Sequence, residues 1–264
     1  MISTPPVVRR SLSKLVRQSP LGRGARMAEK NEARALHAQL LPRAAPQVPG
    51  YDLAFAFQAA AACGGDLFDV FSLEDGTMAL CIADVSGKGM EAVRLTSDLR
   101  AAVRACAPEA QTPSELCTTV NRLLSGKFAP GKYATMFYGM LDVPTGTLRY
   151  ENAGHCLPVL VRADGSVEFP ASFSGVLGLF SHWLYQDQEV RLRSGDTLLL
   201  VTDGVLAAEA RRGGEFGYQR IIAAVQNARS SSAAELGNAV LEQVSQFCRG
   251  RLRDDASLII VKAC

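Results

Sequence analysis

Short apolar runs bounded by turn residues occur in groups along this chain, and helical segments separate the groups. Dipeptides such as Asp75-Gly76 and Asp164-Gly165 stand between neighbouring runs and are typical of hairpins. Grouped antiparallel strands with paired helices between them indicate a layered α+β domain rather than a βαβ repeat. The predicted strands are 52–58, 67–73, 78–83, 134–141, 147–152, 158–162, 197–201 and 256–261.

The segments between the strand groups have helical periodicity. From Ala92 to Cys106, apolar residues recur at three-to-four spacing on one face. Two capping-box patterns, Thr112-Pro113-Ser114-Glu115 and Ser232-Ala233-Ala234-Glu235, predict the first turns of two further helices. The stretch 173–188, which contains Trp183, is expected to be a loop whose place relative to any site stays open.

The N-terminal part has a different organisation. Residues 1–28 predict a flexible basic tail, and a solvated terminus is preferred over a nucleic-acid or lipid contact, so no nucleic-acid partner is expected. A helix is predicted from about 29 to 41, with Ala33, Leu36 and Leu40 on one stripe. This stripe either docks on the main body or pairs with a second copy of the chain. Together with a proline-rich connection it forms the linker 29–50, and the main domain is 51–264.

Composition excludes some classes of protein. No apolar run approaches the roughly 20 residues that span a bilayer, so no transmembrane segment is expected. The N-terminus lacks the apolar stretch of a signal peptide, which predicts a cytoplasmic protein. The 7 cysteines form no CxxC pair and indicate small reduced core residues rather than zinc ligands.

Four aspartates stand at the ends of apolar runs. Asp66 follows two glycines, Asp84 ends one run, Asp203 ends another and precedes a glycine, and Asp254 lies just before the last run. Carboxylates at the ends of buried strands, beside glycines that allow close backbone approach, are typical of hard-cation sites. Such oxygen ligands favour magnesium or manganese over zinc. Each Asp-Gly alone is an ordinary turn, so a metal site requires the fold to bring these ends together.

Other catalytic patterns fail. The segment Ser86-Gly87-Lys88-Gly89 is not a phosphate-binding P-loop, because glycine follows the lysine and Ile82 replaces the earlier glycine. A Ser-His-Asp triad has no support beyond His155, which alone favours a structural role.

Taken in order, the motifs resemble the bacterial SpoIIE-like branch of the metal-dependent protein phosphatases (PPM, or type 2C). The resemblance covers about residues 33 to 262 and implies an αββα sandwich, in which helix pairs flank two antiparallel sheets. The motifs are Leu40-Leu41-Pro42, Gly64-Gly65-Asp66-Leu67-Phe68-Asp69, Ala83-Asp84-Val85-Ser86-Gly87-Lys88-Gly89, Asn152-Ala153-Gly154-His155, Gly195-Asp196 with Thr202-Asp203-Gly204-Val205, and Asp254-Asp255-Ala256-Ser257.

The resemblance also implies roles for the acids. Asp84 would bridge two Mn²⁺ or Mg²⁺ ions, the Val85 carbonyl and Asp66 would serve the second ion, and Asp203 and Asp254 would hold the first. Two such cations acidify a water that attacks phosphorus, so no protein nucleophile is needed. One departure is Ala207, which stands where the family usually has glutamate, but that position is not a ligand and activity is expected to survive.

The predicted function is therefore a metal-dependent serine/threonine protein phosphatase. By analogy its substrate is a phosphorylated regulatory protein, a STAS-domain anti-anti-sigma factor. Two alternatives stay open: a pseudophosphatase that binds a partner without turnover, and a metal-dependent phosphatase of a small metabolite. In the family the preceding helix transmits regulatory signals, which makes a homodimer through residues 29–41 a further expectation.

Overall fold

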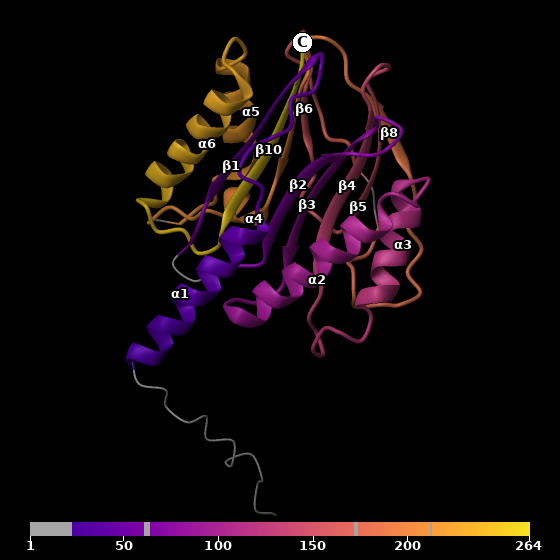
Figure 1. Cartoon of the computed structure of the whole chain (residues 1–264). Helices are drawn as coiled ribbons and strands as arrows, with labels where there is room; N and C mark the ends of the chain where they lie inside the picture. Colours follow the sequence, from indigo (N-terminus) through magenta and orange to yellow (C-terminus); the bar gives the residue numbers. More distant parts are fainter. Residues whose placement is uncertain (1–22, 61–63, 172–173, 212) are drawn as a thin grey trace, which may run out of the picture.

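Two five-stranded antiparallel sheets pack face to face, and a pair of helices covers the outer face of each sheet (Figure 1). The computed structural model describes residues 23–60, 64–171, 174–211 and 213–264. The αββα sandwich predicted from the sequence is confirmed. All of the predicted strands are present, with ends shifted by a few residues.

The first sheet is a continuous antiparallel meander over its four longer strands. Its register pairs Asp66 directly with Asp84 and pairs Asp84 in turn with Thr135. The end of β3 that carries Asp84 is therefore held between two neighbours. In spatial order the strands are β2 (Asp66–Ser72), β3 (Met78–Val85), β4 (Ala134–Asp142), β5 (Thr147–Ala153) and β8 (Gln188–Arg191).

The second sheet joins segments that are far apart in the sequence. Its last strand in sequence, β10, pairs with β1 on one side, from Tyr51 opposite Ala263 to Gln58 opposite Ala256, and with β9 on the other. Because β9 and β10 are apolar and buried along nearly their whole length, they form the middle of the molecule. The order is β1 (Tyr51–Gln58), β10 (Ala256–Ala263), β9 (Thr197–Val201), β6 (Val159–Val161) and β7 (Val167–Glu168).

Three apolar layers hold the sandwich together. The middle layer fills the space between the sheets with large side chains such as Phe68, Ile82, Phe137 and Leu200. An outer layer packs α2 (Met90–Cys106) and α3 (Pro113–Leu124) on the first sheet. The other outer layer packs α5 (Gly217–Asn227) and α6 (Ala233–Cys248) on the second sheet, next to the short helix α4 (Asp203–Leu206).

The two predicted capping boxes differ in outcome. At Ser232 the box is complete, because the serine hydroxyl accepts from the Glu235 amide and the Glu235 carboxylate accepts from the Ser232 amide. At Thr112 only half forms: the threonine oxygen accepts from the Glu115 amide, whereas the Glu115 carboxylate accepts from the Gln111 amide instead. The first-turn position of the helix is correct in both cases.

Four elements are absent from the sequence prediction: β7, β8, α4 and α5. The two strands are short, and β8 alternates between partly buried and exposed residues, so no apolar run marks either of them. The helix α4 has a single turn, which is too short to show a helical repeat of apolar residues. The helix α5 has only Ile221, Ala224 and Val225 buried, which makes its apolar stripe narrow.

The N-terminal helix α1 spans Arg23–Leu40 and begins earlier than the predicted start near residue 29. Its apolar stripe docks on α2, since Ala33 is fully buried against Val93, and Leu40 packs beside it. Ala33 is therefore unavailable for pairing with a second chain in this conformation, whereas Leu36 is 40% exposed. The expected homodimer through residues 29–41 stays a prediction. Residues 1–22 of the predicted tail lie outside the described residues, and 23–28 are helical rather than tail.

The described cysteines are all reduced. Cys81, Cys117 and Cys248 are buried as predicted, Cys106 and Cys156 are partly buried, and Cys264 is exposed. Cys63 lies outside the described residues. Among the helices of the described ranges, none is long and apolar enough to cross a membrane.

The α6 helix approaches its sheet closely at Gly237, and we predict that Gly237→Ala destabilises the fold. A Cβ there would lie 2.9 Å from both Ala56 Cβ and Ile260 Cδ1, and the first of these atoms cannot rotate away. Alanine gains about 1 kcal/mol of helix propensity, but overpacking costs about 1–3 kcal/mol, so a net loss is expected. Urea denaturation measures the difference in free energy of unfolding. The control Asn238→Ala, on the exposed side of the same turn, should be neutral or stabilising, and an equal gain in both variants would contradict the packing argument.

Candidate metal centre

Three of the four predicted acids meet at one cavity. Asp84 comes from the end of β3, Asp203 from the start of α4, and Asp254 from the turn before β10. The cavity measures about 310 Å³, and its other lining residues include Val85, the proposed carbonyl ligand. The remaining lining residues are Ser86, Gly87, Lys88, Tyr133, Thr135, Gly154, His155 and Cys156. The ends of strands from both sheets therefore converge here, as the metal-site prediction requires.

Asp66 lies beside this cavity rather than in its lining. It is 1% exposed, and its Oδ2 accepts hydrogen bonds from Thr202 Oγ1 at 2.8 Å and Ser257 Oγ at 2.5 Å. Both donors belong to the second sheet or its edge, whereas Asp66 opens the first. Its carboxylate therefore joins the two sheets in this conformation, and its predicted role as a ligand stays a prediction.

Glycines let the backbone segments around the cavity come close together. A Cβ on Gly65 would lie 2.1 Å from the Val85 carbonyl oxygen, and one on Gly204 would lie 1.9 Å from the Asp255 carbonyl oxygen. Both contacts are with backbone, which cannot move aside as a side chain can. The glycines next to Asp66 and Asp203 thus have the close-approach role expected from the sequence.

Two further residues support the acids, and the sequence interpretation assigned them no role. Asp255 is fully buried and accepts from the Ala60 amide at 2.7 Å and the Gly64 amide at 2.9 Å. His37 of α1 is 3% exposed; its Nε2 donates to the Asp66 carbonyl oxygen at 2.6 Å, and its Nδ1 lies 3.8 Å from Asp255. His37 follows Leu36 within the predicted helix, but only the folding of distant segments against each other brings it to Asp66.

The carboxylates raise one another's pKa values. Burial, followed by the charges of Asp203 and Asp254, raises the pKa of Asp84 to about 7. Burial and Asp254 raise the pKa of Asp203, while burial and Asp84 raise the pKa of Asp66. The Lys88 ammonium lies 3.0 Å from Asp254 and offsets part of this negative charge.

Hard divalent cations suit this donor set. The acids supply only oxygen, and a bound cation would relieve the repulsion that raises their pKa values. Within the described ranges, however, no three His, Cys, Asp or Glu side chains already surround one point in a metal-binding arrangement.

His155 is a buried neutral residue in the cavity wall. Burial lowers the pKa of its imidazole to about 4, and its Nδ1 forms a 2.8 Å hydrogen bond with the hydroxyl of Thr135. The same hydroxyl lies 3.5 Å from the Asp84 carbonyl oxygen. These contacts favour the structural role that the sequence indicated.

The segment after residue 173 passes behind the cavity wall, where Val176 packs on Gly154, and then leads away to the helix layer. Asn121 of α3 donates to the Phe180 carbonyl and accepts from the Gly178 amide, which fixes this loop on the first sheet's helix layer. Trp183 packs over Gly175, and residues 174–187 contribute nothing to the described cavity lining.

Comparisons with known proteins agree with this fold and motif order. The family model for stage II sporulation protein E (SpoIIE) matches residues 74–263. Protein IcfG of Synechocystis sp. is 24% identical over 90% of this chain, and phosphoserine phosphatase RsbU of Bacillus subtilis is 24% identical over 84%. The chain spans 42% and 66% of those two proteins' lengths.

Solved structures show the same architecture. The RsbU and RsbW domains of Rv1364c from Mycobacterium tuberculosis align with a TM-score of 0.66 and 30% identity, over 85% of this chain and 64% of that one. The PP2C phosphatase domain of SpoIIE from Bacillus subtilis aligns with a TM-score of 0.71 and 17% identity, over 82% of this chain and 64% of that one. The αββα sandwich with acids at one edge is thus that of the PP2C class. Within that class the chain belongs to the SpoIIE family.

The raised pKa of Asp84 predicts a pH-dependent effect of Asp84→Asn on cation-free protein. A carboxyl whose folded pKa is about 7, against an ordinary 3.8, favours folding below pH 4 and loses that contribution as pH rises through 7. The variant should therefore be more stable than the unmodified chain at pH 8, by about 2–4 kcal/mol, with the difference vanishing near pH 4.

Urea denaturation in EDTA across this pH range measures the difference. Asp75→Asn, in an exposed turn where asparagine keeps the acceptor for the Thr77 amide, is the matched control and should show no such trend. A variant less stable than the unmodified chain at pH 8 would contradict the repulsion argument.

Proposed function

We propose that this chain is a metal-dependent protein serine/threonine phosphatase. The observation that carries the proposal is the convergence of Asp84, Asp203 and Asp254 on one cavity, where burial and then the charges of the other two acids raise the pKa of Asp84. Membership of the SpoIIE family and similarity to phosphoserine phosphatases RsbU and RsbP of Bacillus subtilis support the same reaction.

In the proposed reaction the chain's own residues hold and orient the reactants. Asp84, the Val85 carbonyl, Asp203 and Asp254 bind Mn²⁺ or Mg²⁺, with Asp66 as the further ligand of the second ion. Divalent cations at such a site acidify water and neutralise charge on phosphoryl oxygens. Lys88, next to Asp254 at the cavity wall, adds positive charge where the phosphoryl group enters.

The proposed substrate is a phosphoserine or phosphothreonine on a regulatory protein, a STAS-domain anti-anti-sigma factor. Two similar structures support a role in partner switching: one joins RsbU and RsbW domains in a single Mycobacterium tuberculosis protein, and another comes from the bacterial stressosome. Removal of the phosphate would free such a factor to bind its anti-sigma partner.

A pseudophosphatase is the second candidate. It is favoured by one observation: the Asp66 carboxylate already accepts hydrogen bonds from two hydroxyls, those of Thr202 and Ser257. Turnover by the purified chain excludes it, whereas tight binding of the phosphoprotein without turnover in manganese would establish it. Higher turnover of small phosphorylated metabolites than of phosphoproteins would instead favour a metabolite phosphatase.

We predict that Asp203→Asn and Asp254→Asn each lower phosphopeptide hydrolysis by at least about 100-fold, because loss of ligand charge removes cation stabilisation of the transferring group. EDTA should abolish activity, and Mn²⁺ or Mg²⁺ should restore it in the unmodified chain. Phosphate release from a phosphoserine peptide is the measurement. Asp164→Asn, in an exposed hairpin turn, should keep full activity. Activity that persists in EDTA would refute metal dependence.

A further inference from the structure

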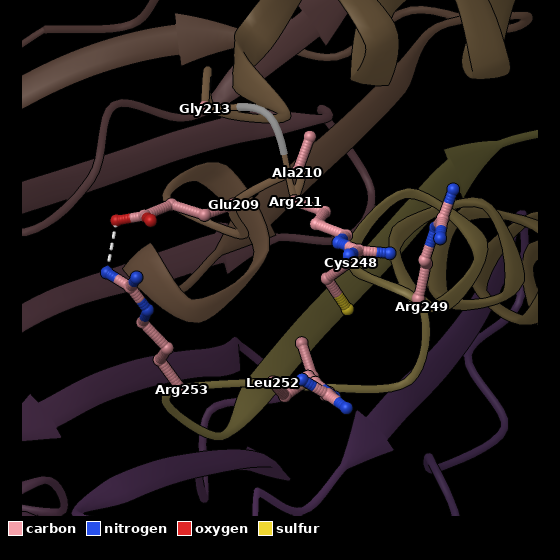
Figure 2. A pocket seen from close by; sticks show the side chains of 9 residues that line it. Glu209, Ala210, Arg211, Gly213, Cys248, Arg249, Leu252 and Arg253 are labelled. Carbon is pink, nitrogen blue, oxygen red and sulfur yellow. Dashed lines mark hydrogen bonds and ion pairs between the residues drawn. The ribbon is translucent and has the colours of Figure 1, made fainter.

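A groove lined by arginines lies outside the acid cavity. Its volume is about 680 Å³, and two parts of the chain form it: residues 209–211 and 213, which come after α4, and residues 248–253, which start at the last residue of α6. Figure 2 shows the side chains of Arg211, Cys248 and Arg249 at this groove. The charged lining residues are Arg211, Arg249, Arg251, Arg253 and Glu209.

The positive charge of this groove is largely uncompensated. Arg253 forms an ion pair with Glu209, drawn as a dashed line in Figure 2. Over the described part of the chain, no carboxylate forms an ion pair with Arg211, Arg249 or Arg251, and all three side chains are exposed. Like charges gathered on one concave surface create a positive potential that attracts anionic partners.

The backbone at Arg249 adds a second sign of a specialised position. Arg249 ends α6 in the left-handed region, with φ of 54°, where glycine or asparagine is the usual residue. An arginine there also faces the carbonyl end of the helix, which favours a cation. That helix-end effect accounts for arginines beside the end of α6, whereas Arg211 belongs to the separate segment after α4.

The groove and the acid cavity are adjacent at one point of the chain. Arg253 lines the groove and precedes the cavity acid Asp254, and Lys88 of the cavity donates to the Arg253 carbonyl at 2.5 Å while it pairs with Asp254. Glu209 and Arg211 of the groove follow Asp203 through α4. A chain segment whose phosphorylated residue enters the 310 Å³ cavity can therefore extend past Arg253 into this groove.

We propose that this arginine groove docks an acidic segment of the protein substrate, beside the residue that is dephosphorylated. Guanidinium groups bind carboxylates through paired hydrogen bonds, and a positive groove beside the cavity also steers an acidic partner toward it. This assignment rests on the proposed phosphatase function for its catalytic meaning. It adds a substrate feature, glutamate or aspartate near the phosphorylated side chain, that the metal centre alone does not select.

The test uses two phosphoserine peptides of equal length, one with glutamates flanking the phosphoserine and one with glutamines instead. The variant is Arg249→Asn with Arg251→Gln, since asparagine tolerates the left-handed backbone at 249. The control variant, Arg43→Gln with Arg122→Gln, removes the same charge from exposed positions outside the groove. An aryl phosphate, which has no flanking segment, reports the catalytic centre alone.

The unmodified chain and the control should hydrolyse the glutamate peptide with a kcat/KM about tenfold above the glutamine peptide, mainly through KM. In the groove variant this preference should be lost, with aryl phosphate hydrolysis unchanged. Higher ionic strength should reduce the preference as well. Equal use of both peptides by the unmodified chain, or an equal preference in the groove variant, would overturn the docking assignment.

Direct binding separates this proposal from the proposed function. Fluorescence anisotropy in EDTA, with a labelled glutamate peptide, should show binding to the unmodified chain and the control and weaker binding to the groove variant. That result supports the groove even if the chain hydrolyses no phosphate, which would refute only the phosphatase function. Equal binding by all three proteins would refute the docking assignment. Binding of a single-stranded RNA oligomer in place of the acidic peptide would refute it as well.

Discussion

The buried carboxylate of Asp66 is the contact on which the arrangement of the two sheets and the metal centre depends. It starts the first sheet, yet its hydrogen bonds come from Thr202 and Ser257, next to β9 and in β10 of the second. A buried carboxylate is costly unless its oxygens are paired, so these donors hold the strand ends in register across the sandwich. Asp203 and Asp254 stand one and three residues from those donors, and their positions at the cavity follow from the same contact.

Much of the fold could be predicted because its signals are local. Apolar alternation and turn dipeptides identify β1 to β6, and Ser232 with Glu235 marks the start of α6 by a contact within a single turn. Four aspartates beside glycines and strand ends predicted a site, and three of them do share a cavity. Elements as short as β7 and α4 contain too few residues to show an alternating or a helical pattern of apolar side chains.

The remaining features depend on contacts between distant segments, which no local pattern encodes. The hydrogen bond between Thr202 and the Asp66 carboxylate joins segments far apart in the sequence. The same is true of the hydrogen bond from His37 to the Asp66 carbonyl oxygen at the start of β2. The arginine groove likewise combines residues from two separate turns. Ala33 and Leu36 occupy the same predicted stripe, yet only the docking of α1 on α2 decides that the first is buried and the second exposed.

The pairing of β1 with β10 has a kinetic consequence. Tyr51 lies opposite Ala263, so this strand pair brings together residues from the two ends of the 51–264 domain. The first sheet contains two local hairpins, β2–β3 and β4–β5, which are joined through α2 and α3. Because closing a long loop costs entropy before any contact offsets it, β10 should join late and slowly. The turn with Asp254 and Asp255 joins with it, so the acid cavity is completed among the last events of folding.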